Sequence, residues 1–271
     1  MNLINIKATT LPDAWFQTLY ACIEHGREFI INQGSFEGQK RLEFDHITVQ
    51  ITHPGAMPLL PKLNPLLGLP DPVAEGYLDD YLPYLITGEE KLGEAYTYGQ
   101  RLCCAFMPLS EFFLLASEMN ILITDFDQLE ELGIIKRGMN LYSFQGYLVN
   151  QIELMIWTYK NKGYRNNQMI LQVGQPSDML LKDPPCLRHI DTRIQDGKLH
   201  FFPYFRSWDL WGGFPANLAA IEMMKQYCAA EIGVENGEII ASSKGLHLYN
   251  YVWEIAETIR GRKMEEFRQY D

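Results

Sequence analysis

The sequence predicts a single domain over residues 1–271, with helices packed on an antiparallel or mixed sheet. Helical and strand patterns alternate along the chain without a linker, an internal repeat or a low-complexity segment. Two strand patterns, residues 189–195 and 198–206, are separated by an Asp-Gly pair that is typical of a two-residue hairpin turn. Residues 218–232 are so apolar that we expect a long, buried central helix there.

Hydrophobic spacing predicts the other elements in order. Apolar residues three and four positions apart predict helices over 12–25, through most of 73–135, over 144–160 and over 247–260. Alternation or short apolar runs predict strands over 45–52, 168–173 and 238–243. Six prolines predict an ordered loop over 53–72, two tyrosines mark 93–99 as a candidate site loop, and 133–138 is a weak candidate for a domain boundary.

Composition and charge narrow the possible partners. Lys and Arg total 23 against 34 Asp and Glu, so the net charge of −11 repels a polyphosphate backbone and argues against nucleic acid. The chain has no long apolar run and its N-terminus has no signal-peptide layout, which predicts a cytoplasmic protein that does not bind membranes. Five cysteines without CxxC spacing argue against disulfides and a zinc site, and no metal is expected.

Cys186 is a candidate nucleophile. It follows Pro184 and Pro185 at the entrance to a predicted strand, and Arg188 comes two residues later. A rigid loop and a nearby cation lower a thiol pKa and raise the thiolate fraction. The alternative is a buried core cysteine beside a loop.

A second cluster of polar residues lies just before the apolar helix. Arg206 and the Ser207 hydroxyl suit a phosphate, because a guanidinium offers a forked, charged contact. Asn217 can donate and accept at once, so it can hold the amide edge of a pyrimidine. The alternative is a helix entry in which Asp209 and Asn217 cap the backbone and Arg206 is paired on the surface.

His247 and Tyr249 form the third candidate group. Alternation places both on one face, where they can hydrogen-bond sugar hydroxyls. The alternative is a satisfied core pair.

Taken together and in this order, the three groups resemble the thymidylate synthase family. The shared pattern is a Pro-Cys nucleophile, then Arg-Ser-x-Asp-x-x-x-Gly-x-Pro-x-Asn, then His-x-Tyr. Its fixed places are occupied by Cys186, Arg206, Ser207, Asp209, Gly213, Pro215, Asn217, His247 and Tyr249. Residues 149–152 and the Tyr98-Gly99 pair also resemble family segments. The resemblance is firm over 145–255 and faint before about residue 90.

The resemblance implies an α+β sandwich, a mixed sheet packed by helices with a long central buried helix, that forms a homodimer through the backs of its sheets. It also implies the conversion of deoxyuridylate to thymidylate with methylenetetrahydrofolate as co-substrate. Cys186 would add to ring carbon six, which makes carbon five nucleophilic toward the folate methylene. Proton removal and hydride transfer would then give thymidylate and dihydrofolate.

The same resemblance implies roles for the other residues. Arg206 and Ser207 would bind phosphate, Asn217 would hold the uracil edge, and His247 with Tyr249 would hold the ribose. Three further roles are implied: Asp209 facing the pterin, Tyr98 ordering water for proton transfer, and Arg165 reaching the phosphate of the partner chain.

The chain departs from the family pattern in three places. Where the common enzymes have two adjacent arginines, this chain has only Arg165, so Arg188 or Arg193 would compensate. Asp80 is the carboxylate nearest to the position of the family's general-base glutamate. Residues 266–271 lack the apolar character of the tail that closes over folate.

Two other functions remain open at this point. A pyrimidine nucleotide hydroxymethylase, acting on deoxyuridylate or deoxycytidylate, traps the intermediate with water instead of hydride. The cytidylate enzyme typically has Asp at the ring edge, so Asn217 favours uracil. The third possibility is a non-catalytic protein that binds a nucleotide or RNA. The complete set of site residues argues against a protein without catalytic activity, and the net charge of −11 argues against RNA binding.

Overall fold

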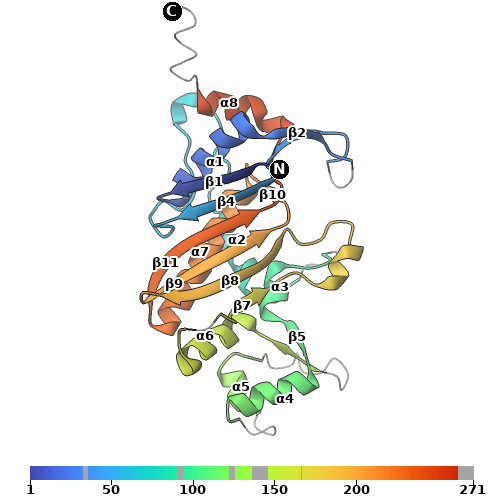
Figure 1. Cartoon of the computed structure of the whole chain (residues 1–271), viewed down its shortest axis with the longest axis vertical. Coiled ribbons are helices and arrows are strands. Elements are labelled where there is room, and N and C mark those ends of the chain that lie inside the picture. Colours follow the sequence, from blue (N-terminus) through green and yellow to red (C-terminus); the bar gives the residue numbers. More distant parts are fainter. Residues whose placement is uncertain (33–35, 91–93, 122–125, 136–145, 166, 262–271) are drawn as a thin grey trace, which may run out of the picture.

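A six-stranded mixed sheet lies at the centre of the fold (Figure 1). The computed structural model describes all residues except 33–35, 91–93, 122–125, 136–145, 166 and 262–271. The strand order is β1 (Leu3–Ala8), β4 (His46–Ile51), β11 (Glu235–Ser243), β9 (Lys198–Phe205), β8 (Leu187–Gln195) and β7 (Ile170–Gln172). Two pairs, β1 with β4 and β9 with β11, are parallel and the others are antiparallel.

One face of this sheet is covered by helices. Helix α7 (Gly213–Ile232) contacts β9 and β11, and α1 (Leu11–His25) and α2 (Tyr77–Ile86) contact α7. Alternate residues of the strands, such as Phe201 and Phe205 in β9, are buried on this side. The residues between them point to the other side and are half-buried, so alternation gives the sheet one sealed and one partly open face.

Two smaller sheets lie beside the central one. The first has the order β10 (Trp208–Asp209), β12 (Leu246–Tyr249), β3 (Lys40–Glu43) and β2 (Arg27–Ile30). The second pairs β5 (Ala105–Pro108) with β6 (Gly146–Val149) and shares a separate apolar cluster with α4 (Leu109–Glu118). Figure 1 places α4 and α5 (Phe126–Glu131) at the opposite end of the molecule from α8 (Trp253–Arg260).

Short helices complete the chain. Helices α3 (Tyr98–Cys103) and α6 (Gln151–Lys162) flank β7, and the described part of the chain has three 3-10 helices in turns. These are η1 (Pro65–Leu67), η2 (Pro176–Leu180) and η3 (Asn250–Val252).

Several predicted elements are confirmed. The helix over 12–25 is α1, and the strand over 45–52 is β4. In the β8–β9 hairpin Asp196 has φ 52° and Gly197 has φ 74°, the two positive angles that this turn requires. The buried central helix is α7, which begins five residues before the predicted start. The α+β class with mixed sheets packed by helices is therefore confirmed.

Two predicted helices are wrong at their beginnings. Residues 146–149 form β6, and α6 begins at Gln151 because the Asn150 side chain accepts the N–H of Ile152 at 3.0 Å. Residues 246–249 form β12, and α8 begins only at Trp253. Strand β5 likewise interrupts the stretch 73–135, since pairing with distant segments overrides the local pattern. The boundary candidate at 133–138 and the tail 266–271 reach outside the described residues.

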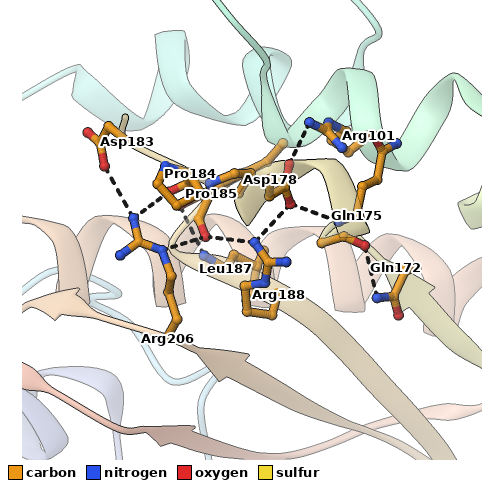
Figure 2. A network of polar contacts seen from close by, with 12 residues as sticks. Arg101, Gln172, Gln175, Asp178, Asp183, Pro184, Pro185, Leu187, Arg188 and Arg206 are labelled. Carbon is orange, nitrogen blue, oxygen red and sulfur yellow. Dashed lines mark hydrogen bonds and ion pairs between the residues drawn. The ribbon is translucent and has the colours of Figure 1, made fainter. Parts of the chain in front are cut away.

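A buried carboxylate ties the loop before β8 to helix α3 (Figure 2). Asp178 in η2 is 1% exposed, and its Oδ1 accepts Arg101 Nη2 at 2.9 Å. Its Oδ2 accepts Arg188 Nη1 at 2.9 Å and the backbone N–H of Gln175 at 2.7 Å. Arg188 Nη1 also donates to the carbonyl oxygen of Pro185 at 3.4 Å. The cluster therefore fixes the residue that precedes Cys186.

Replacing this carboxylate is expected to cost substantial stability. Burial raises the pKa of Asp178, but the Gln175 N–H and the two guanidiniums outweigh it and lower the pKa overall. The folded carboxyl thus stabilises the protein above its unfolded pKa of about 3.9, and this stability is lost as the pH falls through the lower folded value. Asp178→Asn should lower the free energy of unfolding at pH 7 by about 3 to 5 kcal/mol, since two guanidiniums lose their counter-charge.

Urea unfolding at pH 7 and at pH 3.5 checks this expectation. The difference between wild type and Asp178→Asn should shrink at the lower pH, which lies below the unfolded pKa of about 3.9, because the unfolded wild-type chain then binds a proton that the folded carboxylate does not. Glu118→Gln is the matched control, because Glu118 is exposed and pairs with Lys162 at 2.7 Å, and an exposed ion pair of this kind contributes little to stability. Equal losses in the two variants would contradict the role given to Asp178.

Candidate active site

Most of the predicted site residues line one cavity of about 340 Å³. It lies where the start of β8 and the end of β9 meet the smaller sheet of β10, β12 and β3. The predicted residues in its wall are Cys186, Arg206, Ser207, Asp209, His247 and Tyr249. Segments more than 60 positions apart in sequence are thus brought to one place.

Cys186 is the partly exposed cysteine of the chain, whereas the other four cysteines are buried. Burial raises the pKa of its thiol, and the Arg206 guanidinium is the main group that opposes this shift. The expectation that Arg188 gives a lowered pKa is therefore wrong. The physical reason is that the Arg188 guanidinium is paired with Asp178, which leaves Arg206 as the principal cation near the sulfur.

Arg206 holds the nucleophile loop from the cavity side. Its Nε donates to the carbonyl oxygen of Pro185 at 3.2 Å, and its Nη2 donates to the carbonyl of Pro184 and to Asp183 at 3.2 Å. Its backbone N–H also donates to the carbonyl of Cys186 at 2.8 Å. Figure 2 shows two guanidiniums converging on the Pro185 carbonyl, that of Arg188 in β8 and that of Arg206, which directly follows β9. The guanidinium thus combines a structural contact with a place in the cavity wall.

His247 is held as a neutral imidazole. It is 3% exposed, and burial together with the Arg41 and Arg206 cations lowers its pKa to about 4. Its Nδ1 lies 2.9 Å from the carbonyl oxygen of Gly245, so Nδ1 carries the proton and donates. Nε2 then accepts, and it has no hydrogen-bond partner among the residues that the structure describes. This arrangement suits a ligand hydroxyl.

Asp209 both lines the cavity and caps helix α7. Its carboxylate accepts the backbone N–H of Trp211 at 3.3 Å, of Gly212 at 3.0 Å and of Gly213 at 2.9 Å. Asp209 therefore binds backbone N–H groups at the start of the helix, as the helix-entry alternative predicted. Asn217 differs, because its side-chain amide contacts the side chains of Trp208 and Tyr81.

Two predicted residues lie close to the cavity without forming its described wall. Asn217 is in the first turns of α7, a few residues after Asp209. The Tyr98 hydroxyl oxygen accepts the backbone N–H of Leu187, the residue after Cys186, at 3.2 Å. Tyr98 therefore reaches the nucleophile loop from α3.

Arg165 does not join these residues within one chain. It lines a separate cavity of about 570 Å³ near the tip of the β8–β9 hairpin, together with Arg193. Arg193 Nη2 donates to Asn167 at 3.2 Å. The neighbouring Asn166 lies outside the described residues.

Sequence reasoning missed Arg41, which lines the cavity. Arg41 lines the cavity because β3 pairs with β12, which places Arg41 opposite Tyr249. No local pattern could indicate this long-range pairing. Asp80, the carboxylate nearest to the family's general-base position, is exposed on α2 and is not among the described residues of the cavity wall.

Neither a metal cluster nor a membrane span is found in the described part of the chain. No three His, Cys, Asp or Glu side chains gather there in a metal-binding arrangement. No helix there is long and apolar enough to cross a bilayer.

Comparison with known proteins agrees with the geometry. Residues 84–270 match the family model described as thymidylate synthase. Proteins named "Putative thymidylate synthase" from Methanosarcina acetivorans and Methanosarcina mazei are each 28% identical over 256 residues, which cover 94% of this chain and 93% of theirs. The thymidylate synthase of Listeria monocytogenes is 32% identical over 123 residues, 44% of this chain and 39% of its own. The chain belongs to the thymidylate synthase family.

Proposed function

We propose that this protein is a thymidylate synthase, a methyltransferase that converts deoxyuridylate to thymidylate with methylenetetrahydrofolate. The observation that carries the proposal is one cavity whose wall holds a partly exposed thiol, a guanidinium and a neutral imidazole: Cys186, Arg206 and His247. This set matches a nucleophile, a phosphate ligand and a ribose ligand. We also propose that the chain forms one domain over residues 1–271.

The chemistry assigned to this chain begins at Cys186. Its sulfur forms a bond to carbon six of the uracil ring, and the electron pair of the 5,6 double bond moves so that carbon five becomes nucleophilic. Methylenetetrahydrofolate supplies the one-carbon unit and the hydride. The sulfur leaves when the ring double bond re-forms. The Tyr98 hydroxyl, anchored beside Cys186, is proposed to order water for removal of the proton from carbon five.

The remaining residues bind and orient. Arg206 and Ser207 hold the phosphate, and Arg41 adds a second cation in the same wall. His247 Nε2 accepts a ribose hydroxyl, with the Tyr249 hydroxyl beside it. The residues fit a folate because Asp209 is in the cavity wall and its Oδ1, which accepts one backbone N–H, keeps a second lone pair for an N–H group of a pterin ring.

We propose further that two chains form a homodimer through the open face of the central sheet. The half-buried side chains of this face include apolar ones, among them Phe202, Tyr204 and Ile240. Arg165 and Arg193 together line a cavity near the hairpin tip, away from Cys186 of their own chain. Two guanidiniums presented by a partner chain would help to neutralise a phosphate dianion.

Cys186→Ser is expected to abolish turnover of deoxyuridylate by several orders of magnitude, because an alcohol is a far weaker nucleophile than a thiolate. Nucleotide binding measured by calorimetry should stay close to that of the wild type. Cys228→Ala is the control, since Cys228 is buried in α7 and should keep its activity when changed. Near-native turnover of Cys186→Ser would refute the proposed mechanism.

Mixing two inactive variants tests the shared phosphate site. In a heterodimer of Arg165→Ala with Cys186→Ser, one site combines an intact Cys186 with an intact partner Arg165, so activity should return. Mixing Arg206→Ala with Cys186→Ser is the matched control, because both residues belong to one chain's cavity and no intact site can form. Subunit exchange is followed by mass spectrometry. Failure of the first mixture to recover activity despite exchange would count against a shared site.

A further inference from the structure

The side-chain amide of Asn217 is fixed in one orientation by two neighbours. Trp208 Nε1 lies 3.0 Å from one amide atom, and an indole N–H can only donate, so that atom is the oxygen Oδ1. The other atom is therefore Nδ2, which donates to the hydroxyl oxygen of Tyr81 at 2.6 Å. The identities of both atoms follow from the chemistry of Trp208.

Both neighbours are packed against other aromatic rings. The Trp208 ring is 2% exposed and stacks on Phe205 with ring centres 4.0 Å apart, while Phe214 packs beside it at 4.5 Å. The Tyr81 ring stacks with Tyr77 at 5.6 Å on helix α2. A flip of the Asn217 amide would place its N–H group against the indole N–H, so the amide has one stable orientation.

The fixed amide retains one donor and one acceptor. An amide has two N–H groups and two oxygen lone pairs, and Trp208 and Tyr81 use one of each. Uracil offers a carbonyl oxygen at ring position four and an N–H at position three, whereas cytosine offers an amino group and an unprotonated nitrogen at these positions. The two bases therefore require opposite orientations of the same amide.

We propose that Trp208 and Tyr81 are positioning residues that determine base selectivity by holding Asn217 in the orientation for uracil. The inference rests on the proposed function, in which Asn217 contacts the base. Neither residue touches the base in this account, and each acts through Asn217.

Calorimetry with deoxyuridylate and deoxycytidylate tests the inference on the full-length protein. The wild type should prefer deoxyuridylate. The selectivity ratio is the dissociation constant for deoxycytidylate divided by that for deoxyuridylate. In Trp208→Phe, which keeps an aromatic ring but removes the indole N–H, this ratio should fall about five- to tenfold. Tyr81→Phe removes the acceptor of Nδ2 and should lower the ratio in the same direction. If Trp208→Phe does not fold, Tyr81→Phe alone tests the inference.

Trp15→Phe is the matched control. Trp15 is also a buried tryptophan, but its Nε1 donates to the carbonyl of Leu210 at 3.0 Å and does not contact Asn217. It should leave the ratio unchanged. The affinity for deoxyribose 5-phosphate, which has no base, should stay within about twofold of wild type in all three variants, whereas general damage to the fold would lower it.

The outcomes separate the inference from the function on which it rests. An unchanged ratio in folded Trp208→Phe and Tyr81→Phe, with a selective wild type, would overturn the positioning role alone. A wild type that binds neither nucleotide would overturn the proposed function and the inference with it. A ratio that falls equally in Trp15→Phe would also overturn the positioning role.

Discussion

The position of the candidate nucleophile depends on one buried carboxylate, Asp178, held between Arg101 and Arg188. A buried charge that loses one of two partners is costly, so α3, η2 and β8 stay in register with one another. These elements hold the backbone on both sides of Cys186. Arg188 holds the carbonyl of Pro185 on one side of the cysteine, and Tyr98 of α3 holds the N–H of Leu187 on the other.

The same cluster explains the electrostatics of the cavity. Near Cys186 in sequence, Arg188 is the obvious cation, yet its guanidinium already faces a carboxylate. Arg206, which is 20 positions away but pairs its backbone with the Cys186 carbonyl, is the cation that most opposes the rise in the thiol pKa. Arg206 also helps to keep His247 neutral, so one guanidinium influences both groups.

The sequence predicted the features that local rules determine. The positive φ angles of Asp196 and Gly197, the apolar helix α7 and the alternating strand β4 follow from turn chemistry and periodicity. Six cavity residues were predicted because they lie in motifs whose order resembles a known family. Arg41 could not be predicted, because only the pairing of β3 with β12 brings it to the cavity. The hydrogen bond between Arg101 and Asp178 could not be predicted either, because these residues are 77 positions apart in sequence. Residues 146–149 were predicted as helix, because the pairing that makes them strand β6 is with β5, about 40 residues away, and the local pattern does not show it.

The product formed from deoxyuridylate and methylenetetrahydrofolate tests the proposed function most directly. The purified protein is mixed with both, and the absorbance of dihydrofolate is followed together with the mass of the nucleotide. A thymidylate synthase should form a methylated nucleotide and an equal amount of dihydrofolate. A hydroxymethylated nucleotide without dihydrofolate would contradict the proposed function, since the intermediate would then have been captured by water instead of hydride.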